Sequence, residues 1–111
     1  MTISFDKFLK VDIRVGTIVD VQEFPEARKP AFKLWVDFGA GLGIRKTSAQ
    51  ITKYYTPEEL IGRQVAAVLN FPPEQVGKFM SEFLVLGFPD GDGEVVLIGI
   101  DHEVPKGGRL F

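Results

Sequence analysis

Apolar and polar residues alternate over residues 13–24, which is the spacing of a strand with one buried face and one exposed face. The side expected to face inward is formed by Ile13, Val15, Thr17, Val19 and Val21. Gly16 lies within this run and predicts a bend or bulge, of the kind that curves a sheet into a barrel. A second alternation over 31–38 predicts another strand, whose inner face consists of Phe32, Leu34, Val36 and Phe38.

A third strand is predicted to begin at Ile44, but the stretch 44–54, IRKTSAQITKY, soon becomes small and polar. Small side chains let the backbone of a partner come close, and Arg45 and Lys46 attract anionic groups or peptide carbonyls. We therefore interpret this stretch as the lining of a binding groove. The alternative is a solvated edge strand followed by a polar turn.

The residues after this stretch carry the signals of a short helix and then of further strands. Thr56 is a predicted N-cap, Pro57 occupies the first helical position, Glu59 completes a capping box and Gly62 ends the helix. The remaining pattern predicts a strand over 64–71, a loop or helical turn over 74–81, a strand over 82–88, a hairpin turn over 90–93 and a strand over 94–100. This order predicts an all-β fold, a five-stranded OB-fold barrel with a short helix between strands 3 and 4.

Both ends of the chain carry apolar residues that the barrel does not need. Residues 2–10 predict a short helix, and the tail over 103–111 ends on an apolar pair. A helix of this length is not stable alone, so its apolar side must pack on the body or on a second copy of the chain. We expect a subunit contact formed by Phe5, Phe8, Leu9, Leu110 and Phe111.

Size and composition fit one globular domain over residues 1–111. No apolar run approaches the roughly 20 residues that cross a bilayer, and no signal-peptide pattern is present, so we expect a cytoplasmic protein without membrane insertion. The chain has no cysteine, which excludes disulfides and thiolate metal sites. The net charge is −2, yet residues 28–53 hold six Lys or Arg against one acid, Asp37. This local basic stripe predicts attraction to nucleic acid or to a polar or acidic peptide.

Catalytic chemistry finds little support in the residue pattern. His102 is the only histidine, and one histidine provides neither a metal cluster nor, without a placed serine, a triad. Capping explains the adjacent Glu58 and Glu59, and Asp90 and Asp92 lack the other ligands of a calcium loop. We expect a binding protein that is not an enzyme and has no cofactor and no metal.

An OB barrel binds extended polymers across its second and third strands and the nearby loops. The site predicted on those strands consists of Lys33, Trp35, Arg45, Lys46, Ser48 and Gln50. Its far wall is predicted to consist of Asn70, Phe71, Phe79, Met80 and Ser81. Two of these residues have another interpretation, since Trp35 can cover a subunit contact and Asn70 can initiate the turn before two prolines.

Several segments resemble the OB-fold tRNA-binding domain of free-standing tRNA-binding proteins and of methionyl- and phenylalanyl-tRNA synthetases. They are VDIRVGTIVDV (11–21), KTSAQITKYYTPEELIGRQV (46–65), NFPP (70–73) and MSEFLVLG (80–87). Within this family, FPEARKPAFKLWVDFG (24–39) and SAQIT (48–52) are most similar to the CsaA-type secretion chaperones. The resemblance covers nearly the whole chain.

The resemblance implies a homodimer of OB barrels, with N- and C-terminal extensions that help to form the subunit contact. It also implies binding of unfolded or pre-secretory polypeptides and cooperation with the export ATPase SecA. The alternative is structure-specific tRNA binding. The tRNA-binding relatives carry a serine followed three residues later by a methionine, and this chain has Ser81 and Leu84 at those positions.

Overall fold

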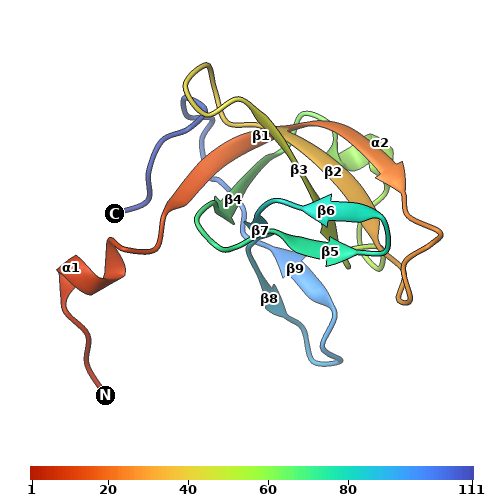
Figure 1. Ribbon diagram of the computed structural model, residues 1–111, viewed down its shortest axis with the longest axis horizontal. Helices are drawn as coiled ribbons and strands as arrows, with labels where there is room; N and C mark the ends of the chain where they lie inside the picture. The colour runs from red at the N-terminus through yellow and green to blue at the C-terminus, as the bar shows by residue number, and fades with distance from the viewer.

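The computed structural model describes residues 1–111 and is mostly β (Figure 1). Five antiparallel strands form a nearly closed barrel in the order β3, β2, β1, β4, β7. Their bounds are β1 Ile13–Glu23, β2 Phe32–Asp37, β3 Ile44–Ala49, β4 Gln64–Val68 and β7 Leu84–Val85. The short helix α2, Pro57–Leu60, lies between β3 and β4 in sequence. The predicted OB-fold barrel is therefore confirmed.

Two local predictions hold in detail. In β2, Phe32, Leu34 and Val36 are buried, because this strand alternates without interruption over one face of the core. Helix α2 has the capping box formed by Thr56 and Glu59. Its Leu60 is fully buried and belongs to the main core cluster, so the helix closes part of the barrel.

The predicted inner face of β1 is correct at Ile13 and Val21 and wrong at Val19, because a bulge changes which residues point inward. In the pairing with β2, Ile18 lies opposite Val36 and Asp20 lies opposite the next residue, Trp35. Val19 therefore has no partner in β2 and forms the bulge. Ile18, which was predicted to face outward, is consequently buried in the main core beside Val21, whereas Val19 is exposed. Ile13 is buried in a separate small cluster that includes Ala66 and Val68, with Phe8, Val11 and Leu86 packed against it.

Gly16 is required by close packing, and the bulge lies three residues beyond it. A Cβ at this position would lie 2.6 Å from Val36 Cγ1 and 2.7 Å from the ring of Phe38, both of which are buried. We expect Gly16→Ala to lower the free energy of unfolding by about 2 kcal/mol, since overpacking a well-packed core typically costs 1–3 kcal/mol. Urea denaturation measures this change. Gly41→Ala, where nothing lies within 4 Å of an added Cβ, is the matched control and should change stability little.

The segment after β4 differs from its prediction. The predicted loop or helical turn over 74–81 is a hairpin of β5, Glu74–Val76, and β6, Phe79–Ser81. Gly77 makes its turn with φ +61, as a two-residue hairpin turn with glycine at the first position requires. The predicted strand over 82–88 is divided into β7 and β8, Gly87–Pro89, and β8 pairs with β9, Val95–Leu97, around the predicted turn.

The two ends of the chain lie on the same side of the barrel (Figure 1). Helix α1, Phe5–Phe8, is shorter than predicted and is capped by Ser4. The tail runs antiparallel to the start of β1, where Gly107 N donates to Val15 O at 2.8 Å and Leu110 N donates to Ile13 O at 2.8 Å. Arg109 donates to the carbonyl of Leu9, so the tail also contacts the end of the helical segment. Neither helix has the length or the apolar content that crossing a membrane would require.

Candidate functional site

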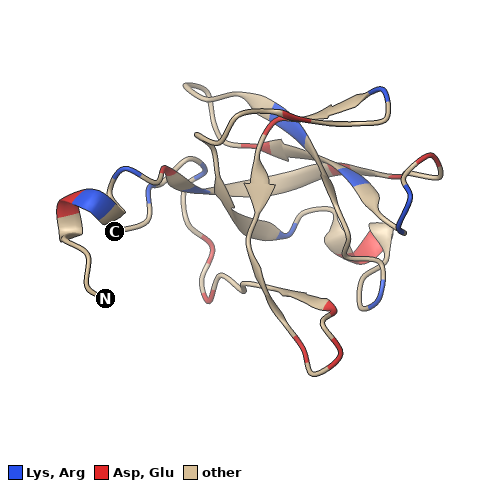
Figure 2. Ribbon diagram, turned by 60° about the horizontal axis from the view of Figure 1, so that its bottom comes forward, with Lys and Arg blue, Asp and Glu red and all other residues tan.

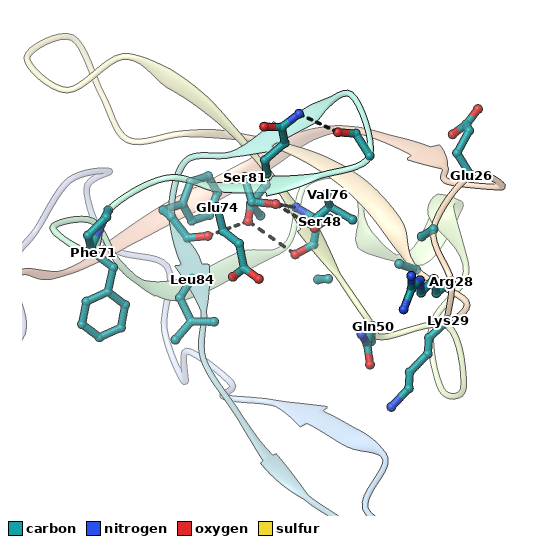
Figure 3. A pocket seen from close by; sticks show the side chains of 18 residues that line it. Glu26, Arg28, Lys29, Ser48, Gln50, Phe71, Glu74, Val76, Ser81 and Leu84 are labelled. Atoms are coloured by element: carbon teal, nitrogen blue, oxygen red, sulfur yellow. Dashed lines mark hydrogen bonds between the residues drawn. The ribbon is translucent and has the colours of Figure 1, made fainter.

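A groove of about 980 Å³ lies between the loop over 26–31, the end of β3 and the β5–β6 hairpin (Figure 3). Small side chains line its middle, including Ala49, Ser48 and Ser81. Phe71 and Leu84, which are 49% and 48% exposed, lie at one end. The groove thus offers two accessible apolar side chains beside a polar middle without bulk.

The opposite end of the groove is charged. Arg28 and Lys29 from the loop after β1 lie there, with Gln50 beside them (Figure 3). Glu26 and Glu74 also belong to the lining. These charged residues and the apolar end suit a polymer whose side chains vary along its length.

Side chains, rather than a continuous ladder, join β3 to the segment around β6, and we call this junction the seam. Ser81 Oγ accepts from Ser48 N at 3.0 Å and lies 2.7 Å from Ser48 Oγ. Lys46 N donates to Glu82 Oε1 at 2.9 Å, and Glu82 N donates to Lys46 O at 2.9 Å. The seam fixes the position of the groove wall that the hairpin provides.

A second feature, which we call the cation–aromatic cluster, consists of Phe24, Lys33, Trp35, Lys46 and Phe79. Lys33 Nζ lies 4.8 Å from the ring centroid of Phe24 and 5.2 Å from that of Phe79. Lys46 Nζ lies 5.1 Å from the centroid of Phe79, and the Trp35 ring is 6.2 Å from the same ring. Trp35 and Lys46 are cross-strand partners, which places their side chains on one face of the sheet.

The structure places eight of the eleven predicted binding residues in these two features. The groove is lined by Ser48, Gln50, Phe71 and Ser81. The cation–aromatic cluster contains Lys33, Trp35, Lys46 and Phe79. The two features adjoin on one face of the sheet, since Lys33 of the cluster and Ser48 of the groove are cross-strand partners.

Arg45, Asn70 and Met80 belong to neither feature. Successive residues of a strand point to opposite faces, so the side chain of Arg45 lies on the face of β3 opposite that of Lys46. The Nε of Arg45 donates to Leu42 O at 3.4 Å. Asn70 joins β4 to the segment before β1: its Oδ1 accepts from Asp12 N at 2.9 Å and its Nδ2 donates to Lys10 O at 2.7 Å. These contacts favour a structural role for Asn70 over either role proposed from the sequence.

Sequence reasoning missed some residues of both features. In the sequence, Arg28 and Lys29 stand out only as part of a basic stripe, although loops beside the second and third strands of an OB barrel commonly contact ligands. Phe24 ends the first predicted strand and gave no signal of its contact with Lys33. The contact of Phe24 with Phe79, 5.4 Å between ring centroids, depends on the β5–β6 hairpin, which the sequence did not indicate.

The residues predicted to form a subunit contact gather at the chain ends. Phe5, Leu110 and Phe111 are exposed, Phe111 by 94%. Phe8 and Leu9 are half-buried, since Phe8 packs on the cluster around Ile13. The exposed members form an apolar surface that the chain itself leaves open.

Hydrogen bonds displace the pKa values of groups near the loops. The hydroxyl of Tyr54 donates to Asp90, which lowers the pKa of Asp90 and raises the pKa of Tyr54. This bond ties the turn of the β8–β9 hairpin to the segment before α2. Two hydrogen bonds lower the pKa of Asp37. The larger effect comes from the backbone N–H of Gly39, and the next from the side chain of Lys106.

The residues weighed for catalysis are dispersed. His102 is exposed and lies 3.2 Å from Asp101. No group of three or more His, Asp or Glu side chains lies close enough together to hold a metal ion.

Comparison with known proteins relates the whole fold to two kinds of protein. A family model described as "Putative tRNA binding domain" matches residues 13–109. The chaperone CsaA from Bacillus anthracis is 49% identical, and the match covers 100% of both chains with a TM-score of 0.92. The CsaA chaperone protein from Picrophilus torridus is 47% identical over 99% of this chain and 100% of that chain, with a TM-score of 0.90.

A methionine–tRNA ligase from Porphyromonas gingivalis is 39% identical over 108 residues. The match covers 97% of this chain but only 15% of the ligase. The chain therefore spans a small part of the length of the curated relatives that it matches.

Proposed function

This chain belongs to the tRNA-binding-domain family and is a homologue of the CsaA chaperones, and on that basis we propose that it is a homodimeric chaperone for unfolded or pre-secretory polypeptides in protein export. The observation that carries the proposal is the groove. It combines accessible apolar side chains at Phe71 and Leu84 with a small, polar middle around Ser48. Such a surface holds a flexible chain without demanding one sequence.

The backbone of the groove wall supports binding of an extended chain. Strand β5 pairs only with β6, so its other edge has no partner strand. Residues of β5 line the groove, and an exposed strand edge can add an extended peptide through main-chain hydrogen bonds. Main-chain bonding is independent of the client's side chains, which suits a chaperone.

The exposed apolar residues at the chain ends support the homodimer. Phe5 and Phe111 are large and accessible, and Phe111 ends the tail that is anchored on β1. Burying them against a second copy would remove apolar area from water and would place two grooves on one particle. Two grooves raise the avidity for a long unfolded chain.

The proposal places this work in the cytoplasm, where pre-secretory chains are made, and includes cooperation with the export ATPase SecA. It assigns no catalytic role to any residue. In this respect the chain differs from the ligases that contain a similar domain.

A second candidate function is tRNA binding, and the cation–aromatic cluster favours it. Lys33 and Lys46 can contact phosphates, and Trp35 and Phe79 provide rings on which unpaired bases can stack. The cluster adjoins the groove at Lys33 and Ser48, so a competition experiment decides whether the two ligands exclude each other.

One preparation of the protein tests both functions. An unfolded presequence peptide and tRNA are titrated separately and then in competition, and aggregation of an unfolded client is followed at equal molar amounts of the protein. We expect peptide binding and suppressed aggregation. Unchanged aggregation together with no detectable peptide complex would refute the chaperone function, and the absence of a tRNA complex at moderate salt would refute the second function.

A further inference from the structure

The free edge of β5 offers the main chain of one residue, Gln75. The turn between β5 and β6 contains two residues, so the pair that flanks it, Val76 and Phe79, exchanges both of its backbone hydrogen bonds. Bonded and non-bonded pairs alternate along antiparallel strands, and Gln75 therefore forms a non-bonded pair with Met80. The N–H and C=O of Gln75 point away from β6, and no turn, loop or side chain elsewhere in the molecule bonds them.

The rest of this edge is closed on both sides of Gln75. Pro73, which precedes β5, has no N–H to donate. On the other side, Gly77 O accepts from Gln75 Nε2 at 2.9 Å and is engaged within the hairpin. Prolines and short edge strands are common means by which proteins prevent pairing with other chains. The edge that remains can bond one residue of a partner but is too short to grow into a continuous sheet.

The second two-stranded sheet of the fold, β8–β9, lacks an equivalent edge. Residues 87–100 contain three acids and no Lys or Arg, and Figure 2 shows these acids gathered at the end of the hairpin. Charged side chains on an edge discourage pairing with another chain. Strand β8 also ends in Pro89, which has no N–H. Of the two hairpins, that of β5 and β6 is therefore the one open to an extended chain.

The open position of β5 belongs to the groove. Glu74, Gln75 and Val76 all contribute to the lining. The other side of the hairpin, along β6, is occupied, because Ser81 bonds to Ser48 across the seam. An incoming chain thus meets the hairpin along β5.

We propose that Gln75 is the main-chain anchor of the groove, and that a client binds as an extended segment with apolar side chains on both sides of the anchored residue. This inference rests on the proposed chaperone function and names the class of segment that the groove takes. In an antiparallel pair, one client residue exchanges both hydrogen bonds with Gln75, and its side chain points to the same face as that of Gln75. The two neighbouring client side chains point to the other face, as those of Glu74 and Val76 do.

The face that carries Glu74 and Val76 turns these two client side chains into the groove. Figure 3 shows the side chain of Glu74 extending from β5 toward Leu84. Phe71 and Leu84 receive one apolar residue, and the small side chains around Ser48 leave space for the second. The groove therefore selects residues at alternate positions, which is the period of an extended strand. A helix presents its apolar residues three and four positions apart and does not match this spacing.

The variant Gln75→Pro tests the anchor and leaves the β5–β6 ladder intact, because the N–H that proline lacks points away from β6. The matched control is Gln75→Ala, which also removes the side-chain bond to Gly77 O but keeps the N–H. The probe is a labelled, serine-rich peptide with a single leucine–serine–leucine segment, and fluorescence anisotropy measures its affinity. We expect Gln75→Pro to lower this affinity roughly tenfold and Gln75→Ala to change it by less than about twofold.

Two changes in the peptide test the same contact on the unaltered protein, so they do not depend on the fold of a variant. N-methylation of the serine between the leucines removes the donor that meets Gln75 O, and it should weaken binding roughly tenfold. A peptide of the same composition with adjacent leucines should also bind roughly tenfold more weakly, since one leucine then points away from the groove.

The anchor is overturned if Gln75→Pro binds the peptide as tightly as Gln75→Ala, or if N-methylation leaves the affinity unchanged. Equal affinity for the two leucine arrangements overturns the selection of alternate positions. In each of these cases, a peptide that is lost on changing Phe71 and Leu84 to alanine leaves the chaperone function standing. An unaltered protein that binds no unfolded peptide and does not suppress aggregation refutes the proposed function itself.

Discussion

Replacing Phe71 and Leu84 together with alanine should weaken binding of an unfolded apolar peptide by roughly 30-fold or more. Both side chains lie at one end of the groove and are about half exposed, so each retains apolar area that a client can cover. Burying that area contributes on the order of 1–1.5 kcal/mol for each residue. Suppression of client aggregation should fall in parallel, while tRNA binding should stay the same.

Fluorescence anisotropy with a labelled presequence peptide measures this loss. The matched control is Ile44→Ala, which truncates a side chain that is exposed but does not line the groove. It should leave peptide affinity within about twofold of the unaltered protein. An unchanged affinity in the Phe71→Ala, Leu84→Ala variant would show that clients bind elsewhere.

The second large effect concerns the cation–aromatic cluster. Changing Lys33 and Lys46 to glutamate should lower tRNA affinity roughly 100-fold or more, since hydrogen bonds to charged groups contribute about 1.5–3 kcal/mol each. The slope of log affinity against log salt should fall by about one for each phosphate contact removed. Neither lysine lines the groove, so peptide binding should change little.

Filter binding of tRNA over a range of salt concentrations gives both the affinity and the slope. The control variant carries Lys53→Glu and Lys78→Glu, which changes the net charge equally at two exposed positions. If the control lowers tRNA affinity as much as the test variant, the attraction is a property of overall charge. If the test variant loses both peptide and tRNA, the two ligands share one surface.

The parts of the fold that the sequence predicts well are those with short-range signals. The alternation in β2 and the capping box at Thr56 and Glu59 are each complete within a few neighbouring residues. The inner face of β1 was not predictable in the same way. The bulge at Val19 arises because one long strand pairs with β4 along its first part and with β2 along its second.

The residues of the candidate site were likewise predictable only where the signal is complete within a few neighbouring residues. The small and polar residues of the stretch 44–54 indicate Ser48 and Gln50, which line the groove. Sequence proximity also grouped Arg45 with Lys46, although strand geometry separates them. The role of Asn70 depends on Asp12 and Lys10, which are about sixty positions away along the chain, and no local pattern shows such a contact.

The seam beside β3 has a mechanical consequence. Ladders of backbone bonds join β3 to β2 and β1 to β4, whereas the side chains of Ser81 and Glu82 form most of the bonds across the seam. Each of these bonds typically contributes about 1 kcal/mol, and a side-chain substitution removes it while the backbone ladders stay intact. The position of the groove wall accordingly depends on two side chains, those of Ser81 and Glu82, while the shape of the barrel itself is set by the backbone ladders.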